Sequence, residues 1–135
     1  MEFLHEIKSS PPIDVVNLKK LITIKNLPKL CSSINSVIKN NISEGVIYCV
    51  WGEFRIHREE LKYGIRFSMP ECPNALAWTI TSEKSGQDIV IHCTINKMTH
   101  DEDFIQSLKE FVSAWETGIS QHLPATPREN INQDA

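Results

Sequence analysis

The sequence lacks several features that would assign it to a familiar class of protein. No apolar run approaches the roughly 20 residues of a membrane-spanning helix. There is no glycine-rich phosphate loop, and neither a GxGxxG nor a GxSxG motif. The opening MEFLHEIKSSPP has neither the long apolar segment nor the small-residue cleavage site of a secretory signal. We therefore expect a cytoplasmic protein that is not an enzyme of a motif-defined class.

Closely spaced cysteines are also missing. The four cysteines, at positions 31, 49, 72 and 93, form no CxxC pair, so we expect reduced thiols. His92, Cys93 and His100 are close in sequence, but alternation along a strand points His92 and Cys93 to opposite faces. The spacing is not that of a zinc site, so no metal and no cofactor are expected.

An excess of basic residues is absent as well. Fourteen Lys and Arg face 17 Asp and Glu, and the net charge of −3 argues against nucleic-acid binding. The charge is uneven, because residues 1–69 carry ten basic against seven acidic side chains and residues 70–135 carry four against ten. An acidic second half suits a basic partner, although a solvated helix face plus a tail is the favoured interpretation.

The chain has the length of one domain, with 135 residues of which 41% are hydrophobic. Residues 1–12 resemble an arm in which Phe3, Leu4 and Ile7 dock before a Ser-Ser-Pro-Pro break. Residues 13–120 are expected to form the domain, and residues 121–135 a disordered tail rich in polar residues.

The first part of the domain gives mixed signals. In residues 13–26, Asp14 could cap a short helix through Leu21, but the favoured interpretation is a strand near 20–25. Residues 27–41 are predicted as one helix, because apolar residues recur there at steps of three and four.

Alternation then predicts four strands, over residues 46–57, 63–69, 75–82 and 88–96, joined by short hairpin links. A final helix has capping-box spacing at Thr99 and Glu102, a long apolar stripe, and Gly118 as its stop. The order is (β)-α-β-β-β-β-α. This order predicts an α+β fold with an antiparallel sheet of four to five strands and two helices packed on one face.

The same alternation divides the sheet into two faces. The face under the helices is predicted to carry Tyr48, Val50, Phe54, Ile56, Ile65, Phe67, Met69, Leu76, Trp78, Ile80, Ile89, Ile91, Cys93 and Ile95. The open face is predicted to carry the candidate binding residues, which are Trp51, Arg55, His57, Arg66, Thr79 and His92. An exposed tryptophan beside arginines is typical of contact surfaces, although an antiparallel sheet can also simply expose one face to water.

Cys72 is the weak catalytic candidate. It lies between Pro70 and Pro73 in a hairpin link and would need a base such as His57 or His92 beside it. The simpler interpretation is a stiff turn that sets the register of the strands.

The sequence therefore favours a small binding or regulatory domain that contacts another protein, or a second copy of itself, through the open face. No nucleic acid and no membrane are expected as partners. Two alternatives stay open: an immunity or antitoxin-like protein that neutralises a basic partner, and a thiol-dependent enzyme or redox protein that uses Cys72.

Overall fold

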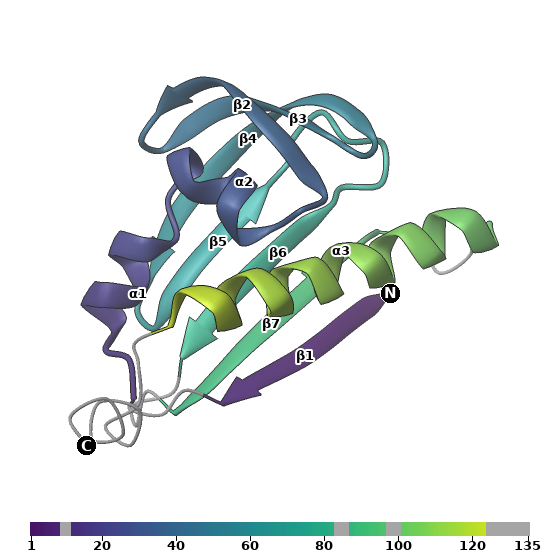
Figure 1. The fold of residues 1–135 in the computed structure, drawn as a ribbon. Helices are drawn as coiled ribbons and strands as arrows, with labels where there is room; N and C mark the ends of the chain where they lie inside the picture. Colours follow the sequence, from purple (N-terminus) through teal and green to yellow (C-terminus); the bar gives the residue numbers. More distant parts are fainter. Residues whose placement is uncertain (9–11, 83–86, 97–100, 124–135) are drawn as a thin grey trace.

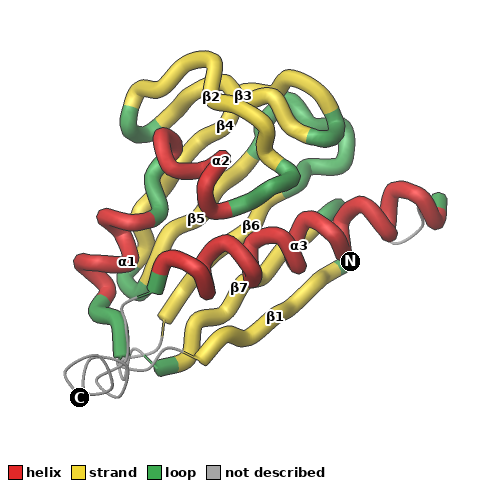
Figure 2. The backbone as a smooth tube through the Cα atoms, viewed as in Figure 1, coloured by secondary structure: helices red, strands yellow, loops and turns green. Residues whose placement is uncertain are grey.

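Seven antiparallel strands form one sheet, and three helices lie on one of its faces (Figures 1 and 2). This computed structural model describes residues 1–8, 12–82, 87–96 and 101–123. The strands are β1 (Glu2–Lys8), β2 (Ile34–Asn41), β3 (Glu44–Cys49), β4 (Gly52–Leu61), β5 (Gly64–Ser68), β6 (Ala77–Ser82) and β7 (Asp88–Thr94). The helices are α1 (Val15–Leu21), α2 (Leu27–Leu30) and α3 (Glu102–His122), with a 3₁₀ turn η1 (Ile24–Asn26) before α2.

The strand order across the sheet is β1-β7-β6-β5-β4-β3-β2. The predicted α+β class, antiparallel sheet and C-terminal helix are confirmed, but four to five strands and two helices were too few. The sheet gains β1 and β2 as its two edges, and β3 and β4 replace one predicted strand. None of the helices in the described ranges is long and apolar enough to cross a membrane.

The expected N-terminal arm contributes a strand. Residues 2–8 pair with β7 along their whole length, from Glu2 opposite Thr94 to Lys8 opposite Asp88. Phe3 and Ile7 face the helices, whereas Leu4 is 62% exposed on the other side. The predicted docking is confirmed for Phe3 and Ile7 and is wrong for Leu4, and the pairing of this segment with β7 was not predicted.

Helix α1 forms where the less favoured alternative placed it. The Asp14 side chain accepts a hydrogen bond from the Asn17 backbone N–H at 2.8 Å, which satisfies one of the free amides of the first turn. The predicted strand near 20–25 is wrong, because helix α1, a bend and η1 occupy those residues.

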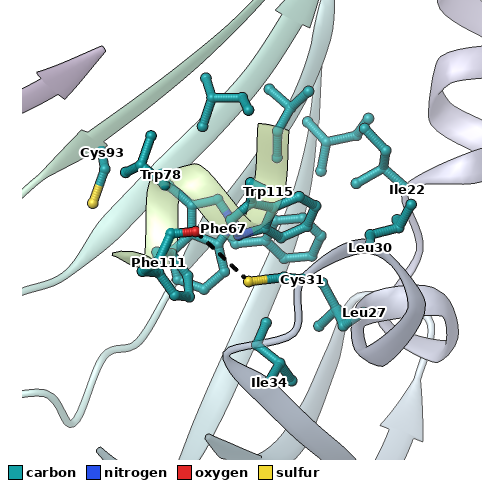
Figure 3. Close-up of a cluster of buried hydrophobic side chains, with 14 of the residues drawn as sticks. Ile22, Leu27, Leu30, Cys31, Ile34, Phe67, Trp78, Cys93, Phe111 and Trp115 are labelled. Carbon is teal, nitrogen blue, oxygen red and sulfur yellow. Dashed lines mark hydrogen bonds between the residues drawn. The ribbon is translucent and has the colours of Figure 1, made fainter. Parts of the chain in front are cut away.

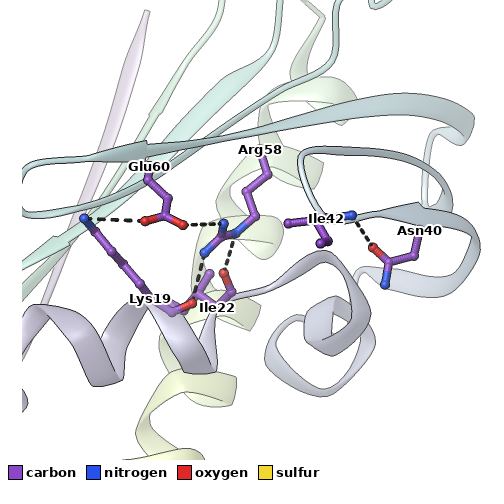
Figure 4. Close-up of polar contacts among 6 residues, drawn as sticks. All are labelled: Lys19, Ile22, Asn40, Ile42, Arg58 and Glu60. Atoms are coloured by element: carbon purple, nitrogen blue, oxygen red, sulfur yellow. Dashed lines mark hydrogen bonds and ion pairs between the residues drawn. The ribbon is translucent and has the colours of Figure 1, made fainter.

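A buried arginine holds the end of α1 against the sheet (Figure 4). Arg58 of β4 donates from Nε to the Ile22 carbonyl and from Nη2 to the Lys19 carbonyl, both at 2.9 Å. Its Nη1 also lies 3.3 Å from Glu60 Oε2. These bonds satisfy carbonyl groups that the end of a helix leaves without partners.

The predicted helix over residues 27–41 is wrong beyond Leu30. The chain extends at Cys31 and continues as β2, which packs against α2. Leu27, Leu30 and Ile34 are all buried at three- and four-residue steps, but the first two belong to a helical turn and the third to a strand. Helical spacing thus arose from two elements that face the same core.

The predicted strand over residues 46–57 is interrupted by a turn at Val50–Trp51. Gly52 has φ of 117°, a conformation that side chains disfavour, and the chain reverses there into β4. The turn inverts the alternation before it: Ile47 and Cys49 are buried, whereas Tyr48 and Val50 are 50% and 55% exposed. The predicted burial of Tyr48 and Val50 is therefore wrong.

The core lies between α3 and the sheet (Figure 3). Phe67 and Trp78 of the sheet stack at 5.4 Å between ring centroids, and Trp78 meets Phe111 of α3 edge-on at 4.9 Å. Trp115 lies 6.0 Å from Phe67. The Cys31 thiol donates to the Phe111 carbonyl at 3.8 Å. Each of these side chains is at most 1% exposed, so aromatic rings fill this part of the interior.

Helix α3 extends past the glycine predicted to stop it. Gly118 lies inside the helix, where a β-carbon would come within 1.9 Å of the Leu30 carbonyl oxygen. The glycine thus permits α2 and α3 to approach each other, and the helix ends at His122. Asp101 is the N-cap, whereas the predicted capping residue Thr99 and most of the predicted tail lie outside the described residues.

Candidate functional site

The face of the sheet away from the helices carries a row of polar side chains across neighbouring strands. Register places His92 of β7 opposite Thr79 of β6, Thr79 opposite Arg66 of β5, and Arg66 opposite Glu59 of β4. Because directly paired residues project to the same side, these four side chains share the outer face. Three of the six predicted residues are thus neighbours in one row.

Glu44 is the centre of a charged cluster beside this row. It begins β3 and lies opposite His57 of β4. Its Oε2 atom lies 3.5 Å from His57 Nε2 and 3.7 Å from Arg55 Nη2. Arg66 Nη1 lies 3.9 Å from Glu59 Oε1. The cluster therefore presents cationic and anionic groups side by side on an exposed surface.

Two hollows adjoin the cluster and share Glu44. One, of about 410 Å³, is lined by Ser43, Glu44, His57, Arg58, Glu59, Arg66 and Ser68. The other, of about 520 Å³, is lined by Lys39, Asn40, Asn41, Glu44, Gly45, Val46 and Arg55. Together they extend from the β2–β3 hairpin to β5, so the surface here can receive projecting groups of a partner.

An exposed isoleucine sits at the turn between β2 and β3. Ile42 has φ of 51° and is 81% exposed, and its backbone N–H donates to Asn40 Oδ1 at 3.3 Å (Figure 4). A left-handed conformation is unfavourable for a β-branched residue. Such strain is more common at functional sites than elsewhere. Ile42 stands between Asn41 and Ser43, which line the two hollows.

Tyr48 supplies an aromatic group on the same face. It pairs with Glu53 across β3 and β4, two positions along from the pair of Val46 and Arg55. We use the name outer-face site for Ile42, Glu44, Tyr48, Arg55, His57, Glu59 and Arg66.

Trp51 is not part of the outer-face site, and its predicted placement is wrong. Its indole Nε1 donates to Ser107 Oγ on α3 at 2.9 Å, and its ring lies 5.1 Å from that of Phe111. The turn before Gly52 directs this side chain toward the helices. Arg55, His57, Arg66, Thr79 and His92 all lie on the outer face as predicted, but whether they bind anything stays a prediction.

The end of the polar row farthest from Glu44 carries fewer charged groups. His92 Nε2 lies 3.1 Å from Glu2 Oε1, which links β7 to the edge strand. Thr79 stands between His92 and Arg66. These residues are continuous with the outer-face site, but they line neither of its hollows.

Sequence reasoning missed Ile42, Glu44 and Tyr48. The predicted helix over residues 27–41 ends within the segment NNISEG, whose Asn, Ser and Gly between two β-branched runs also indicate a hairpin turn. Recognising that hairpin would have placed Glu44 at the start of a strand, and recognising the turn at Val50–Trp51 as well would have placed it opposite His57.

Cys72 has neither His57 nor His92, its two predicted bases, beside it. Cys72 is half-buried and packs against the core, whereas His57 and His92 project from the opposite side of the sheet. Burial raises the pKa of the Cys31 and Cys93 thiols to about 12, and it also raises the pKa of Cys49. Neutral thiols are poor nucleophiles and poor metal ligands. Among the described residues, no group of three His, Cys, Asp or Glu side chains could hold a metal ion.

A comparison with protein-family models and one with curated protein sequences gave no match. Solved structures share the fold. XoxI from Bacillus cereus is 16% identical over 91% of this chain and 94% of its own, with a TM-score of 0.61. A START superfamily protein from Mycobacterium smegmatis is 9% identical over 90% and 97%, with a TM-score of 0.58. An uncharacterized protein from Bacillus thuringiensis is 14% identical over 85% and 97%, with a TM-score of 0.51. At these identities the likeness is one of fold.

Proposed function

We propose that the protein is a small binding domain that contacts another protein through the outer-face site. One observation carries the proposal: charged residues from β3, β4 and β5 converge with an exposed tyrosine on the face that the helices leave uncovered, and the adjoining β2–β3 turn carries a strained, exposed isoleucine. Tyrosine and arginine are the residues that most often dominate interface energetics, and apolar anchors beside them exclude water.

The charge pattern favours a protein partner. Arg55, Arg66 and Lys39 are interleaved with Glu44 and Glu59. A nucleic acid or a free phosphate would meet both carboxylates, whereas a protein surface can match charges of both signs. We therefore propose neither nucleic acid nor membrane as a partner. The four free thiols suit the reducing environment of the cytoplasm.

The filled interior supports an external site. Phe67, Trp78, Phe111 and Trp115 occupy the space between α3 and the sheet, and each is at most 1% exposed. A ligand between α3 and the sheet at this point would have to displace these rings, whereas the outer-face site is open without rearrangement.

The alternatives stay predictions. Acidic side chains of the second half lie on the exposed side of α3, among them Glu102, Asp103 and Glu110, away from the outer-face site. An immunity-like function would use that helix. A thiol-dependent function would require Cys72 to acquire a base from a group other than His57 or His92.

A comparison of two double variants tests the proposal. Arg55→Glu with Arg66→Glu reverses two charges of the outer-face site, and Lys25→Glu with Lys29→Glu makes the same change at exposed positions of η1 and α2. We expect a protein retained by the wild type from a lysate of the source organism, and by the Lys25/Lys29 variant, to be lost by the Arg55/Arg66 variant. Circular dichroism checks that both variants fold.

Three outcomes would overturn the proposal. Retention of the same proteins by all three forms would show that the outer-face site does not select them. A wild type that retains nothing above the bare matrix would show that the site has no partner. Binding that is lost only in the Lys25/Lys29 variant would place the contact on the helical side.

A further inference from the structure

A second interaction surface lies at the edge of the sheet. Within the described part of the chain, β1 has a neighbouring strand on one side only, and Figure 2 shows it as the outermost strand, at the end of the sheet opposite β2. The Met1 carbonyl accepts from the Ile95 N–H at 3.1 Å, and the Met1 amino group donates back to the Ile95 carbonyl at 3.2 Å. These bonds fix which residues of β1 bond to β7.

Hydrogen-bonded and non-bonded pairs alternate along an antiparallel ladder. Because Met1 and Ile95 exchange bonds, Phe3, His5 and Ile7 exchange bonds with β7 in turn. The backbone N–H and C=O groups of Glu2, Leu4, Glu6 and Lys8 therefore point away from the sheet. They form a regular row of donors and acceptors along the edge.

The opposite edge is built differently. The register of β2 shifts between Ile34 and Ser36 and again between Val37 and Lys39. Such irregularities prevent an edge from pairing with another strand. The register of β1 has no shift over seven consecutive pairs. Of the two edges, β1 is the one with the geometry to accept a further strand.

We propose that this strand is β1 of a second copy of the chain, paired antiparallel about a two-fold axis at His5. In this register Glu2 of each copy lies opposite Lys8 of the other, and Leu4 of each copy lies opposite Glu6 of the other. It provides roughly eight backbone hydrogen bonds between the copies. The two sheets then form one continuous sheet, in an isologous arrangement.

Charge favours this register over the two neighbouring ones that also match outward-pointing backbone groups. An axis at Leu4 places Glu2 opposite Glu6, and an axis at Glu6 places Glu6 opposite itself. Like charges directly opposite each other destabilise a strand pair, whereas opposite charges stabilise it. Only the axis at His5 pairs both Glu2 residues with a lysine.

The charges next to β1 extend this pattern. Lys8 forms an ion pair with Asp88, and Glu2 with His92, both on the outer face. Across the proposed interface Asp88, Lys8 and then Glu2 of the second copy form a row of alternating sign. The row occurs twice because of the two-fold axis.

The surface beside β1 is suited to burial. Leu4 is 62% exposed at the edge, and a groove of about 600 Å³ runs between β1 and α3. Phe3 and Val112 give the groove an apolar part, and Lys109 and Glu110 of α3 give it both signs of charge. A surface that contacts its own copy needs such self-complementary charges.

Charge-swap variants test the dimer by sedimentation velocity over a range of concentrations. Glu2→Lys places two lysines opposite each other in the dimer, and Lys8→Glu places two glutamates opposite each other. We expect the wild type to dimerise and each single variant to dissociate at least about tenfold more readily. A mixture of the two variants restores both opposite-charge pairs and is expected to form heterodimers.

The mixture separates an interface from an effect within one chain. Both variants keep their altered ion pairs with His92 or Asp88 in the mixture, so only contacts between copies can restore association. A monomeric wild type at millimolar concentration would overturn the proposal, as would single variants that associate like the wild type or a mixture that stays monomeric. The Arg55→Glu, Arg66→Glu variant is expected to dimerise normally, so a failure of the outer-face site leaves this test intact.

Discussion

The indole of Trp51 and the hydroxyl of Ser107 are joined by a 2.9 Å hydrogen bond between the β3–β4 turn and α3. Ser107 Oγ in turn donates to the Phe104 carbonyl at 2.6 Å. The Trp51 ring also lies 6.1 Å from that of Phe104, edge-on. The tryptophan therefore stabilises the packing of the sheet against the helix and is not available to a partner.

Truncation of Trp51 should accordingly change stability. We expect Trp51→Ala to lower the free energy of unfolding by about 3 kcal/mol, through lost aromatic packing, and Ser107→Ala to lower it by about 1 kcal/mol. The double variant should lose less than the sum, because the two residues share one bond. Urea denaturation measures the free energy of unfolding of the two single variants and the double variant. As a control, Tyr48→Ala on the outer face should lower the free energy of unfolding much less than Trp51→Ala does. A stable Trp51→Ala protein would contradict this assignment.

Replacing Gly118 with alanine should destabilise the protein, whereas the same change at an exposed glycine in a helix stabilises. In an exposed helix, Gly→Ala stabilises by about 1 kcal/mol. Here the new β-carbon would meet the Leu30 backbone, so we expect Gly118→Ala to destabilise by about 3 kcal/mol. Thermal or chemical unfolding measures the change. Thr117→Ala, at the exposed neighbouring position, should be nearly neutral, and a stabilised Gly118→Ala protein would show that α2 and α3 do not approach so closely.

The helix and strands with a single, uninterrupted periodicity could be predicted from the sequence. The apolar stripe of α3 and the alternation of β5, β6 and β7 each lie within one element, so residue spacing reported the buried face correctly. The helix predicted over residues 27–41 was wrong because two different elements face one core there, and local spacing does not distinguish a helical turn from a strand.

Part of the outer-face site could be predicted, because some of its residues lie in strands whose alternation is uninterrupted. Arg55, His57 and Arg66 lie beyond the turn, where alternation runs unbroken, so their side of the sheet was correct. Trp51 lies in the turn itself, where Gly52 adopts a positive φ, so alternation does not apply to it. Glu44 was missed because its pairing with His57 depends on the register between β3 and β4, which follows only once the turn at Val50–Trp51 is recognised.

Replacing Ile42 with glycine should stabilise the protein. Its φ of 51° is strained for a β-branched residue and unstrained for glycine, and its exposed side chain contributes little packing. We expect Ile42→Gly to raise the free energy of unfolding by about 1 kcal/mol. Ile38→Gly, in the adjacent strand, should lower it, because glycine weakens a strand. If the outer-face site binds a partner, Ile42→Gly should weaken that binding despite the gain in stability, whereas unchanged binding would remove Ile42 from the site.

The buried thiols should make stability fall at alkaline pH. Burial raises the pKa of Cys31 and Cys93 from 9.0 to about 12 in the folded protein. Below pH 9.0 both thiols are protonated in both states, so their contribution is fully present. Above it the unfolded chain loses protons that the folded chain keeps, and the free energy of unfolding should fall by about 1.4 kcal/mol per pH unit for each thiol, until the pH reaches the folded pKa.

Urea denaturation under reducing conditions, repeated from neutral pH to above pH 9.0, measures that slope. Tyrosines and lysines also titrate there, so the informative quantity is the difference between the wild type and a Cys31→Ala, Cys93→Ala variant. The packing that the variant loses lowers its free energy of unfolding by the same amount at every pH, so a difference in slope reports the two thiols alone. A shallower alkaline slope in the variant is the expected result. Equal slopes would mean that water reaches both thiols in the folded state, and the core between α3 and the sheet would then be more open than its close-packed rings indicate.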